Sequence, residues 1–262
     1  WMPVKVLRND KGVLTDLSAQ AGLEKTNGLW KRIAPGDFNG DGLPDFIVGN
    51  MGLNSRLEAS PEQPLTLFFN DFDKNGTPEH ILCRYNGGVL LPYILRGDLV
   101  GEIPSLKKKY LKYKRYANQS ITDIFTPEQL ADAVVLKAGV LASGVLMNQG
   151  NGRFVFIPLP SEAQFAPMYG IQVGDFDGDG MQDVLTGGNF LGAKPEFGYM
   201  DADYGLFLKG DGKGGFKPVR SRDSGFHLDG EVRDIRNIRI GQKNVVVVAR
   251  NNMQPLVFSL KK

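Results

Sequence analysis

The sequence predicts an all-β fold: a β-propeller, or the C-terminal portion of one, built of four-stranded antiparallel blades with a helical insertion. Three observations favour this class. Glycine accounts for 33 of 262 residues, well above the average usage of about 7%, and it clusters in turn-like segments that favour many short strands. An acidic loop between two strand-like runs occurs three times. A hairpin-like turn between two apolar runs also occurs three times.

The hairpin-like turns read VLRNDKGVLTDL near Asn9, VLMNQGNGRFVFI near Asn148 and LFLKGDGKGGFKPV near Asp211. Glycine and asparagine readily adopt the positive φ that tight hairpins need, so the flanking runs are expected to pair as adjacent antiparallel strands. One acidic loop, its two strands and one hairpin make a four-stranded unit. The segment from Gly170 to Val219 contains all of these in about fifty residues, a plausible length for a propeller blade.

The chain is expected to form a single propeller domain or a fragment of one. A helical insertion is predicted where TPEQLADAVVL interrupts the strand-like patterns, because Thr126, Pro127 and Gln129 match the start of a capped helix. The expected segments are a partial blade (1–29), a blade region with two of the acidic loops (30–103), the helical insertion (104–136), a strand hairpin returning to the propeller (137–167), a blade with the third acidic loop (168–222) and a last blade (223–262).

The first part of this insertion, SLKKKYLKYKRYANQ, is both helix-like and strongly basic. Leu106, Tyr110, Tyr113 and Ala117 fall at helical spacing, which predicts one buried face. Two interpretations stay open: a helix that packs through its tyrosines with solvated lysines, or a patch for an anionic polymer such as an acidic glycan. The basic residues are Lys107, Lys108, Lys109, Lys112, Lys114 and Arg115.

Each acidic loop places oxygen-bearing side chains at positions 1, 3, 5 and 9. Side chains on alternate residues of a tightly turning loop can converge on one point, and a glycine at position 6 (Gly42, Gly76 or Gly180) lets the chain turn sharply. The carbonyl oxygen of position 7 is expected to add a ligand. The candidate metal ligands are Asp37, Asn39, Asp41, Leu43 and Asp45 in the first loop, Asp71, Asp73, Asn75, Thr77 and Glu79 in the second, and Asp175, Asp177, Asp179, Met181 and Asp183 in the third.

This ligand set predicts Ca²⁺ as the bound ion. Calcium takes about six to eight oxygen ligands, whereas Mg²⁺ prefers near-ideal octahedra and retains several waters. An EF-hand opens with the same motif but needs a glutamate at position 12 and a helix on each side. Position 12 here is Val48, Leu82 or Thr186, and strand-like runs follow each loop. The alternative is that the loops are acidic turns without a metal, since Asp, Asn and Gly favour turns.

The loops GDFNGDGLPDFIVGN and GDFDGDGMQDVLTGGN resemble FG-GAP repeats of the VCBS type, which occur in integrin-like propellers and in many bacterial surface proteins. The resemblance covers most of the chain outside the helical insertion. It implies a β-propeller with Ca²⁺ held between the first two strands of a blade, in a protein that is exported, periplasmic or attached to the cell surface. The second loop departs from the family's aspartates at Asn75 and Glu79, which leaves its occupancy open.

Composition bounds the partners further. The formal net charge of +2, from 31 Lys and Arg against 29 Asp and Glu, gives no argument for a nucleic-acid or membrane partner. The lone Cys83 cannot form an intramolecular disulfide, so a bound metal is one candidate fastener. The longest apolar run, Ala133 to Met147, is interrupted by Lys137 and is too short to span a bilayer. Because the chain opens with Trp1, it is interpreted as part of a longer polypeptide with its targeting segment upstream.

The sequence favours an extracellular binding, adhesion or structural module over an enzyme. It contains no nucleophile elbow, phosphate-binding loop or HExxH motif. The alternative is a carbohydrate-active enzyme, a glycosidase or lyase on a propeller scaffold, which would need two carboxylates about 5 to 9.5 Å apart in a pocket. The expected partner is a protein or glycan ligand, and the long loop 189–204 offers contacts. The candidate contact residues are Phe190, Phe197, Tyr199 and Tyr204, whose alternative role is packing over a neighbouring blade.

Overall fold

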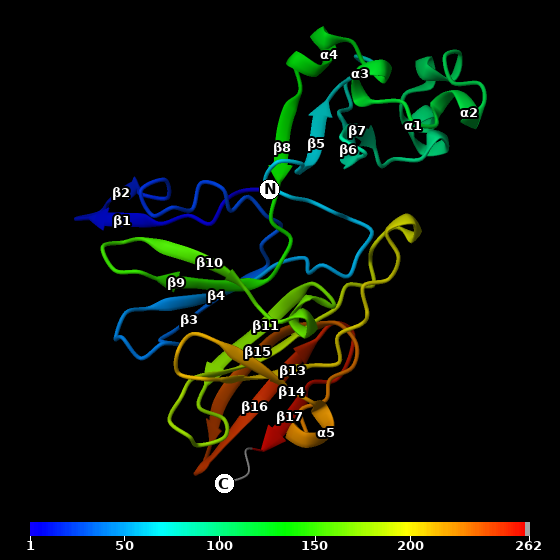
Figure 1. The fold of residues 1–262 in the computed structure, drawn as a ribbon. Helices are drawn as coiled ribbons and strands as arrows, with labels where there is room; N and C mark the ends of the chain where they lie inside the picture. The colour runs from blue at the N-terminus through cyan, green and yellow to red at the C-terminus, as the bar shows by residue number, and fades with distance from the viewer. Residues whose placement is uncertain (260–262) are drawn as a thin grey trace. The chain divides into compact units, whose positions relative to one another are not determined.

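The computed structural model describes residues 1–259 and shows a chain of short antiparallel sheets with a few short helices (Figure 1). Where the sequence predicts a single domain, the chain divides into two compact units. The larger unit contains residues 3–56 and the chain from Leu141 onward, and the smaller contains residues 1–2 and 57–140. The smaller unit therefore interrupts the larger one in sequence. No helix among the described residues is long and apolar enough to cross a membrane.

The first sheet of the larger unit is assembled from two separate stretches of chain. Its order is β10-β9-β4-β3, and the pairing of Val48 with Gly144 and of Phe46 with Leu146 joins the two stretches. The hairpin expected to return to the propeller thus supplies the third and fourth strands of this sheet. The strands are β3 (Arg32–Gly36), β4 (Asp45–Gly49), β9 (Gly144–Asn148) and β10 (Phe154–Pro158).

The second sheet has the same plan in one continuous stretch, with its strands in the order β11-β12-β13-β14. An acidic loop joins the edge strand to its neighbour, and a hairpin joins the third strand to the fourth, as in the first sheet. This is the four-stranded unit that the sequence predicts between Gly170 and Val219. The strands are β11 (Met168–Gly174), β12 (Asp183–Gly188), β13 (Leu206–Gly210) and β14 (Phe216–Val219).

Two smaller sheets complete the larger unit. Within residues 1–259 the last sheet has three strands, β15 (Val232–Ile240), β16 (Lys243–Arg250) and β17 (Leu256–Ser259). The remaining pair is a two-stranded hairpin of β1 (Leu7–Asp10) and β2 (Val13–Asp16). The three predicted hairpins, β1-β2, β9-β10 and β13-β14, are thereby confirmed. The short helices of this unit are η2 (Ser161–Gln164), η3 (Pro195–Phe197) and α5 (Ser221–Ser224).

The smaller unit contains a sheet of order β7-β6-β5-β8 covered by short helices. Its acidic loop joins the two central strands, β5 and β6, whereas the loops of the other two sheets begin at an edge strand. The two loops expected in one blade region, 30–103, therefore lie in different units. The elements are β5 (Leu65–Asn70), β6 (Glu79–Asn86), β7 (Val89–Pro92), β8 (Val134–Ala138), α1 (Arg96–Glu102), η1 (Pro104–Lys107), α2 (Tyr113–Tyr116), α3 (Ile121–Ile124) and α4 (Pro127–Ala131).

The helical insertion starts earlier than predicted, at Arg96, and its basic part is not one helix. Tyr113 is 67% exposed while Tyr110 is 2% exposed, so the prediction that they share one buried face is wrong. Tyr110 packs against Tyr116, with ring centroids 5.6 Å apart. Residues six apart lie on different sides of a continuous helix. The break between η1 and α2 therefore allows both rings to enter the core.

The capped helix start predicted at Thr126 is confirmed. The Thr126 hydroxyl accepts a hydrogen bond from the Gln129 amide at 3.3 Å, and the Gln129 side chain accepts one from the Thr126 amide at 3.0 Å. The Gln129 side chain also donates to the carbonyl of Phe72 at 2.8 Å, inside the second acidic loop. The first turn of α4 is thus hydrogen-bonded to that loop.

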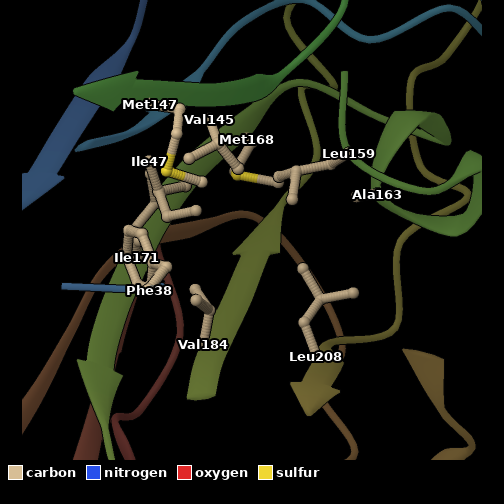
Figure 2. Packing of buried hydrophobic residues seen from close by; sticks show 10 residues of the cluster. All are labelled: Phe38, Ile47, Val145, Met147, Leu159, Ala163, Met168, Ile171, Val184 and Leu208. Carbon is tan, nitrogen blue, oxygen red and sulfur yellow. The ribbon is translucent and has the colours of Figure 1, made fainter. Parts of the chain in front are cut away.

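The largest cluster of buried hydrophobic side chains in the larger unit lies between its first two sheets. Figure 2 shows side chains from β4, β9, β11, β12 and β13 pointing toward one another. Ile47, Ile171, Val184 and Leu208 are at most 1% exposed there. Phe38, from the first acidic loop, belongs to the same cluster, which anchors that loop on the core. A separate cluster in the smaller unit contains Tyr110 and other side chains of the insertion.

We expect Thr126→Ala to lower the free energy of unfolding by about 1 kcal/mol, because it removes the oxygen that accepts the Gln129 amide. Urea denaturation followed by circular dichroism measures the change. The control is Ser105→Ala, which alters an exposed residue of η1. Equal stability of the two variants would contradict the role assigned to the cap.

Candidate metal centre

Each of the three acidic loops joins two neighbouring antiparallel strands. Each begins directly after a strand, and its ninth residue is the first residue of the next strand. Positions 4 and 6 of the first and third loops are glycines with φ between 74° and 84°, a region that residues with a Cβ adopt rarely. In the second loop Lys74 takes position 4 with φ 59°. The first loop (37–45) joins β3 to β4, the second (71–79) joins β5 to β6, and the third (175–183) joins β11 to β12.

Backbone amides hold the first carboxylate of each loop in the same way. In the third loop Asp175 accepts hydrogen bonds from the amides of Gly178 at 2.7 Å and Gly180 at 3.0 Å. Asp37 accepts equivalent bonds in the first loop, and Asp71 accepts amides of positions 5 and 6 in the second. The side chain at position 5 likewise accepts the amide of position 7 in every loop.

The carboxylate at position 9 is buried in all three loops: Asp45 and Asp183 are 0% exposed and Glu79 is 5% exposed. In each loop it accepts the amide of the phenylalanine at position 2, at 2.8 to 3.0 Å. Asp45 also accepts the Asn148 amide of β9 at 2.7 Å. Asp183 accepts the Gly210 amide of β13 at 2.9 Å. In the first and third loops this side chain therefore links the loop to the third strand of its sheet.

The phenylalanine at position 2 is a residue that the sequence reasoning missed. Phe38 and Phe72 are each 3% exposed, and Phe176 packs partly buried against a core cluster. Each ring meets another phenylalanine, as in the contact of Phe72 with Phe125 at 4.2 Å between centroids. The signal was visible, because Asp-Phe opens all three loops. These rings fix the loops on the core and leave the polar side chains facing outward.

Three carboxylates converge in two of the loops. Ligand oxygens of Asp71, Asp73 and Glu79 lie within 4.8 Å of one another, and so do those of Asp175, Asp177 and Asp183. Burial raises the pKa of Asp183, and Asp177 and Asp179 raise it further. Burial also raises the pKa of Glu79, and Asp71 and Asp73 add to the rise. Holding these carboxylates ionised and close together therefore carries an electrostatic cost in the folded protein.

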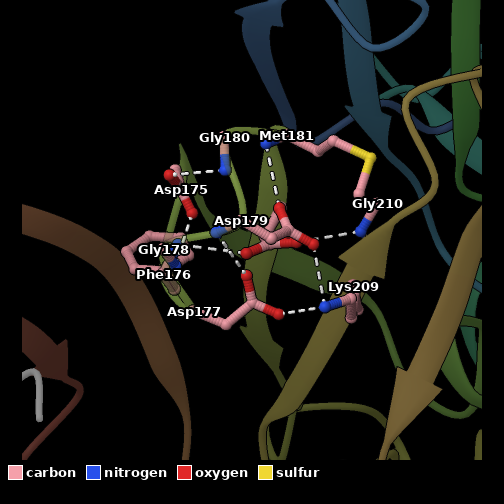
Figure 3. Close-up of polar contacts among 10 residues, drawn as sticks. Asp175, Phe176, Asp177, Gly178, Asp179, Gly180, Met181, Lys209 and Gly210 are labelled. Atoms are coloured by element: carbon pink, nitrogen blue, oxygen red, sulfur yellow. Dashed lines mark hydrogen bonds and ion pairs between the residues drawn. The ribbon is translucent and has the colours of Figure 1, made fainter. Parts of the chain in front are cut away.

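The loops differ in how far nearby side chains offset this negative charge. In the first loop the Asn39 amide group donates to Asp41 at 2.8 Å. In the third, the ammonium group of Lys209 on β13 contacts both Asp177 and Asp179, the latter at 2.8 Å (Figure 3). None of the ion pairs among residues 1–259 involves the second loop. The second loop, which departs most from the pattern in sequence, thus has the least compensated cluster.

Two glutamines outside the predicted set support the loops from other elements. Gln182 of the third loop accepts the Asp37 amide at 2.9 Å and so joins the first and third loops. Gln129 of α4 donates to the second loop, as described above. Neither contact follows from a repeat pattern, because each partner comes from a different element. The carbonyl oxygens of Leu43, Thr77 and Met181 stay predicted ligands.

The residues predicted for ligand contact in the loop 189–204 do not share one environment. Tyr199 is 76% exposed and Tyr204 is 57% exposed, and Tyr204 stacks on His227 at 5.7 Å. Phe190 and Phe197 are half-buried, and Phe190 exchanges backbone hydrogen bonds with Met200. Their role in ligand binding stays a prediction.

A pocket of about 520 Å³ lies in the larger unit. Its lining contains no carboxylate, so the acid pair that a glycosidase would need is not found in this pocket. The lining residues are Leu53, Asn54, Ser161, Gln164, Phe165 and Ala202.

Residues 30–58 match the family model of the FG-GAP repeat. This segment contains β3, the first acidic loop and β4. No curated protein matches the chain.

The loop 189–204 contains an acid whose titration tests its packing. Burial raises the pKa of Asp203 to about 6, from about 3.9 in an unfolded chain. As the pH rises above 4, the unfolded chain releases this proton before the folded chain does. The free energy of unfolding therefore falls until the pH has passed the folded pKa of about 6. We expect the unfolding free energy of Asp203→Asn, relative to the natural protein, to increase by about 1–3 kcal/mol between pH 4 and pH 7. Urea denaturation at both pH values measures it.

The matched control is Asp201→Asn, because Asp201 is exposed in the same loop. It removes one carboxyl group of the loop and leaves Asp203 in place. A difference for Asp203→Asn that is the same at pH 4 and pH 7 would show that the Asp203 carboxyl group is solvated.

Proposed function

This chain is an FG-GAP-type repeat protein, and from this premise we propose that it is a calcium-stabilised propeller module that binds, adheres or provides structure outside the cell. The observation that carries the proposal is the convergence of three carboxylates within 4.8 Å in the second and third loops. The partner class we propose is a protein or glycan ligand. An FG-GAP repeat at residues 30–58 supports a binding or adhesion role.

The donor set fits calcium. Each loop offers carboxylate or amide oxygens at positions 1, 3, 5 and 9, and hard cations such as Ca²⁺ prefer oxygen ligands. The converging groups contain no histidine or cysteine, the ligands that zinc prefers. Asp175, Asp177, Asp179 and Asp183, with the Met181 carbonyl, would hold the ion in the third loop. Asp37, Asn39, Asp41, Leu43 and Asp45 would hold it in the first, and Asp71, Asp73, Asn75, Thr77 and Glu79 in the second.

The bound ion would act on stability. A cation neutralises the clustered charge that otherwise opposes the folded loop, so its binding free energy adds to that of folding. The position 9 carboxylate reaches the third strand in the first and third loops, so the ion would tie the loop to the whole sheet. The second loop has no ion pair among the described residues and would depend on the cation most.

The arrangement of strands in the larger unit supports a propeller. Its first two four-stranded sheets repeat one plan, and the first strands β3, β11 and β15 contact one another in that order. An ion pair of 2.5 Å between Arg32 of β3 and Asp234 of β15 links the outer two of these strands. First strands of successive blades line the axis of a propeller, which is the relation that we propose here.

We expect EDTA to lower the melting temperature by several degrees and added CaCl₂ to restore it. A site at a hundredfold excess of ion over its Kd adds about 2.7 kcal/mol. Calcium sites of extracellular modules have Kd values of about 10⁻⁴ to 10⁻³ M, so about 10 to 100 mM calcium gives that excess. Differential scanning calorimetry measures the shift. Asp177→Asn should reduce it, whereas the control Asp201→Asn, outside the loops, should not. A melting temperature that EDTA leaves unchanged would rule out the proposed role of calcium.

We also expect Lys209→Met to raise the calcium affinity of the third loop severalfold, because its ammonium group competes with the ion for Asp177 and Asp179. Calorimetric titration measures this loop in a background that lacks acids of the other two loops, with Asp37→Asn and Asp41→Asn in the first and Asp71→Asn and Asp73→Asn in the second. Lys217→Met is the control, because Lys217 is exposed and lies opposite Lys209 in the register of β13 and β14. It removes the same charge from the same hairpin. A lower affinity in Lys209→Met would indicate instead that the lysine organises the ligands.

A further inference from the structure

A concentrated basic segment lies in the helical insertion of the smaller unit. Six of the nine residues from Lys107 to Arg115 are basic, and no acidic residue occurs between Ile103 and Thr122. All six basic side chains are exposed. None of them takes part in an ion pair among residues 1–259. The balanced charge of the whole chain therefore conceals a strongly positive local surface, which we call the basic segment.

The basic segment is fixed on the core of its unit. Tyr110 is buried, and the Tyr116 hydroxyl donates to the Ile94 carbonyl at 2.7 Å. The Arg96 guanidinium donates to the Tyr110 carbonyl at 2.5 Å, and the Lys109 ammonium donates to the Asp123 carbonyl at 2.5 Å. The lysines are therefore displayed from an anchored stretch of chain, so ordering them on a partner costs less conformational entropy than ordering a disordered tail.

Apolar side chains are exposed within the same segment. Leu111 is 68% exposed and Tyr113 is 67% exposed. Arg96 brings them together, because its guanidinium lies over the Tyr113 ring at 5.1 Å and donates to the Leu111 carbonyl at 3.2 Å. Leu95, next to Arg96, is 51% exposed. Amphipathic helices that lie at a membrane surface combine lysine and arginine with exposed apolar side chains, and the basic segment has this composition without being one continuous helix.

We propose that the basic segment docks on an anionic lipid surface, with Leu111 and Tyr113 entering the boundary between headgroups and acyl chains. The lysines are attracted by the negative surface potential of such a membrane, and the leucine gains by leaving water. An acidic polysaccharide would use the lysines but would leave Leu111 without a role. Single-stranded nucleic acid stacks successive bases on several aromatic rings, and Tyr113 is the exposed ring among the three tyrosines here.

Acidic residues nearby reduce the positive charge without cancelling it. Residues 96–125 contain seven basic residues against three acidic ones, which are Asp98, Glu102 and Asp123. Asp123 is held by its own capping box, where it accepts the Ser120 amide. The net charge of this stretch is therefore positive, and a surface of the opposite sign is its complement. The inference is independent of calcium binding by the loops.

Vesicle co-sedimentation of the whole chain tests the proposal. The vesicles are phosphatidylcholine alone and phosphatidylcholine mixed with phosphatidylglycerol. We expect partition onto the mixed vesicles only, weakening as salt increases. The triple variant Lys108→Glu, Lys112→Glu, Lys114→Glu should reduce partition by about tenfold or more. The matched control Lys25→Glu, Lys213→Glu, Lys217→Glu changes the net charge equally at exposed sites of the larger unit and should retain most of the binding.

Leu111→Ser separates lipid insertion from charge attraction. It should weaken partition onto mixed vesicles while leaving the charge unchanged, and circular dichroism verifies that each variant is folded. Equal binding of the natural protein to both kinds of vesicle would overturn the proposal, as would full binding by the basic-segment variant. Binding to soluble alginate that is as strong as vesicle binding and indifferent to Leu111→Ser would assign the segment to an acidic polysaccharide instead.

Discussion

The blade-like sheets of this protein depend on a buried carboxylate that begins the second strand. Asp45 and Asp183 are 0% exposed, and a carboxylate is costly to bury unless hydrogen bonds satisfy it. Here the amide of the loop phenylalanine and an amide of the third strand supply those bonds. One side chain thereby sets the turn, aligns three strands and faces the outer acidic residues of its loop. The stability of the sheet and the charge of the loop are consequently linked.

This link explains why the three loops have the same backbone path but different electrostatic balances. Backbone amides organise the first acidic residue of each loop, which fixes the shape without removing the negative charge. In the first loop the Asn39 side chain donates a hydrogen bond to the Asp41 carboxylate, and in the third the Lys209 ammonium group pairs with the Asp179 carboxylate. The second loop, in the middle of its sheet, is supported through the Gln129 side chain of α4. The loops therefore share a geometry and differ in how much of their negative charge neighbouring side chains offset.

The smaller unit shows how a repeat fold accommodates a large insertion. It enters between the second and third strands of the first sheet, at a point where β4 and β9 can still pair. Its own sheet and helices enclose a separate core, so the insertion does not have to use the core of its host. The lysines of the insertion stay outside this core and are exposed on its surface.

Local chemistry determined much of this protein from the sequence alone: the Asn-Gly and Gly-Asp-Gly turns specify hairpins, Thr126 with Gln129 specifies a helix start, and alternating Asp residues specify the acidic loops. These features need only neighbours within a few residues. Tertiary structure decided the rest. The sequence could not show that β9 pairs with β4 or that Lys209 reaches the third loop. It also could not show that Tyr110 and Tyr116 pack in one core because the basic part is not a continuous helix. Each depends on contacts between segments far apart in the chain, where packing outweighs local preference.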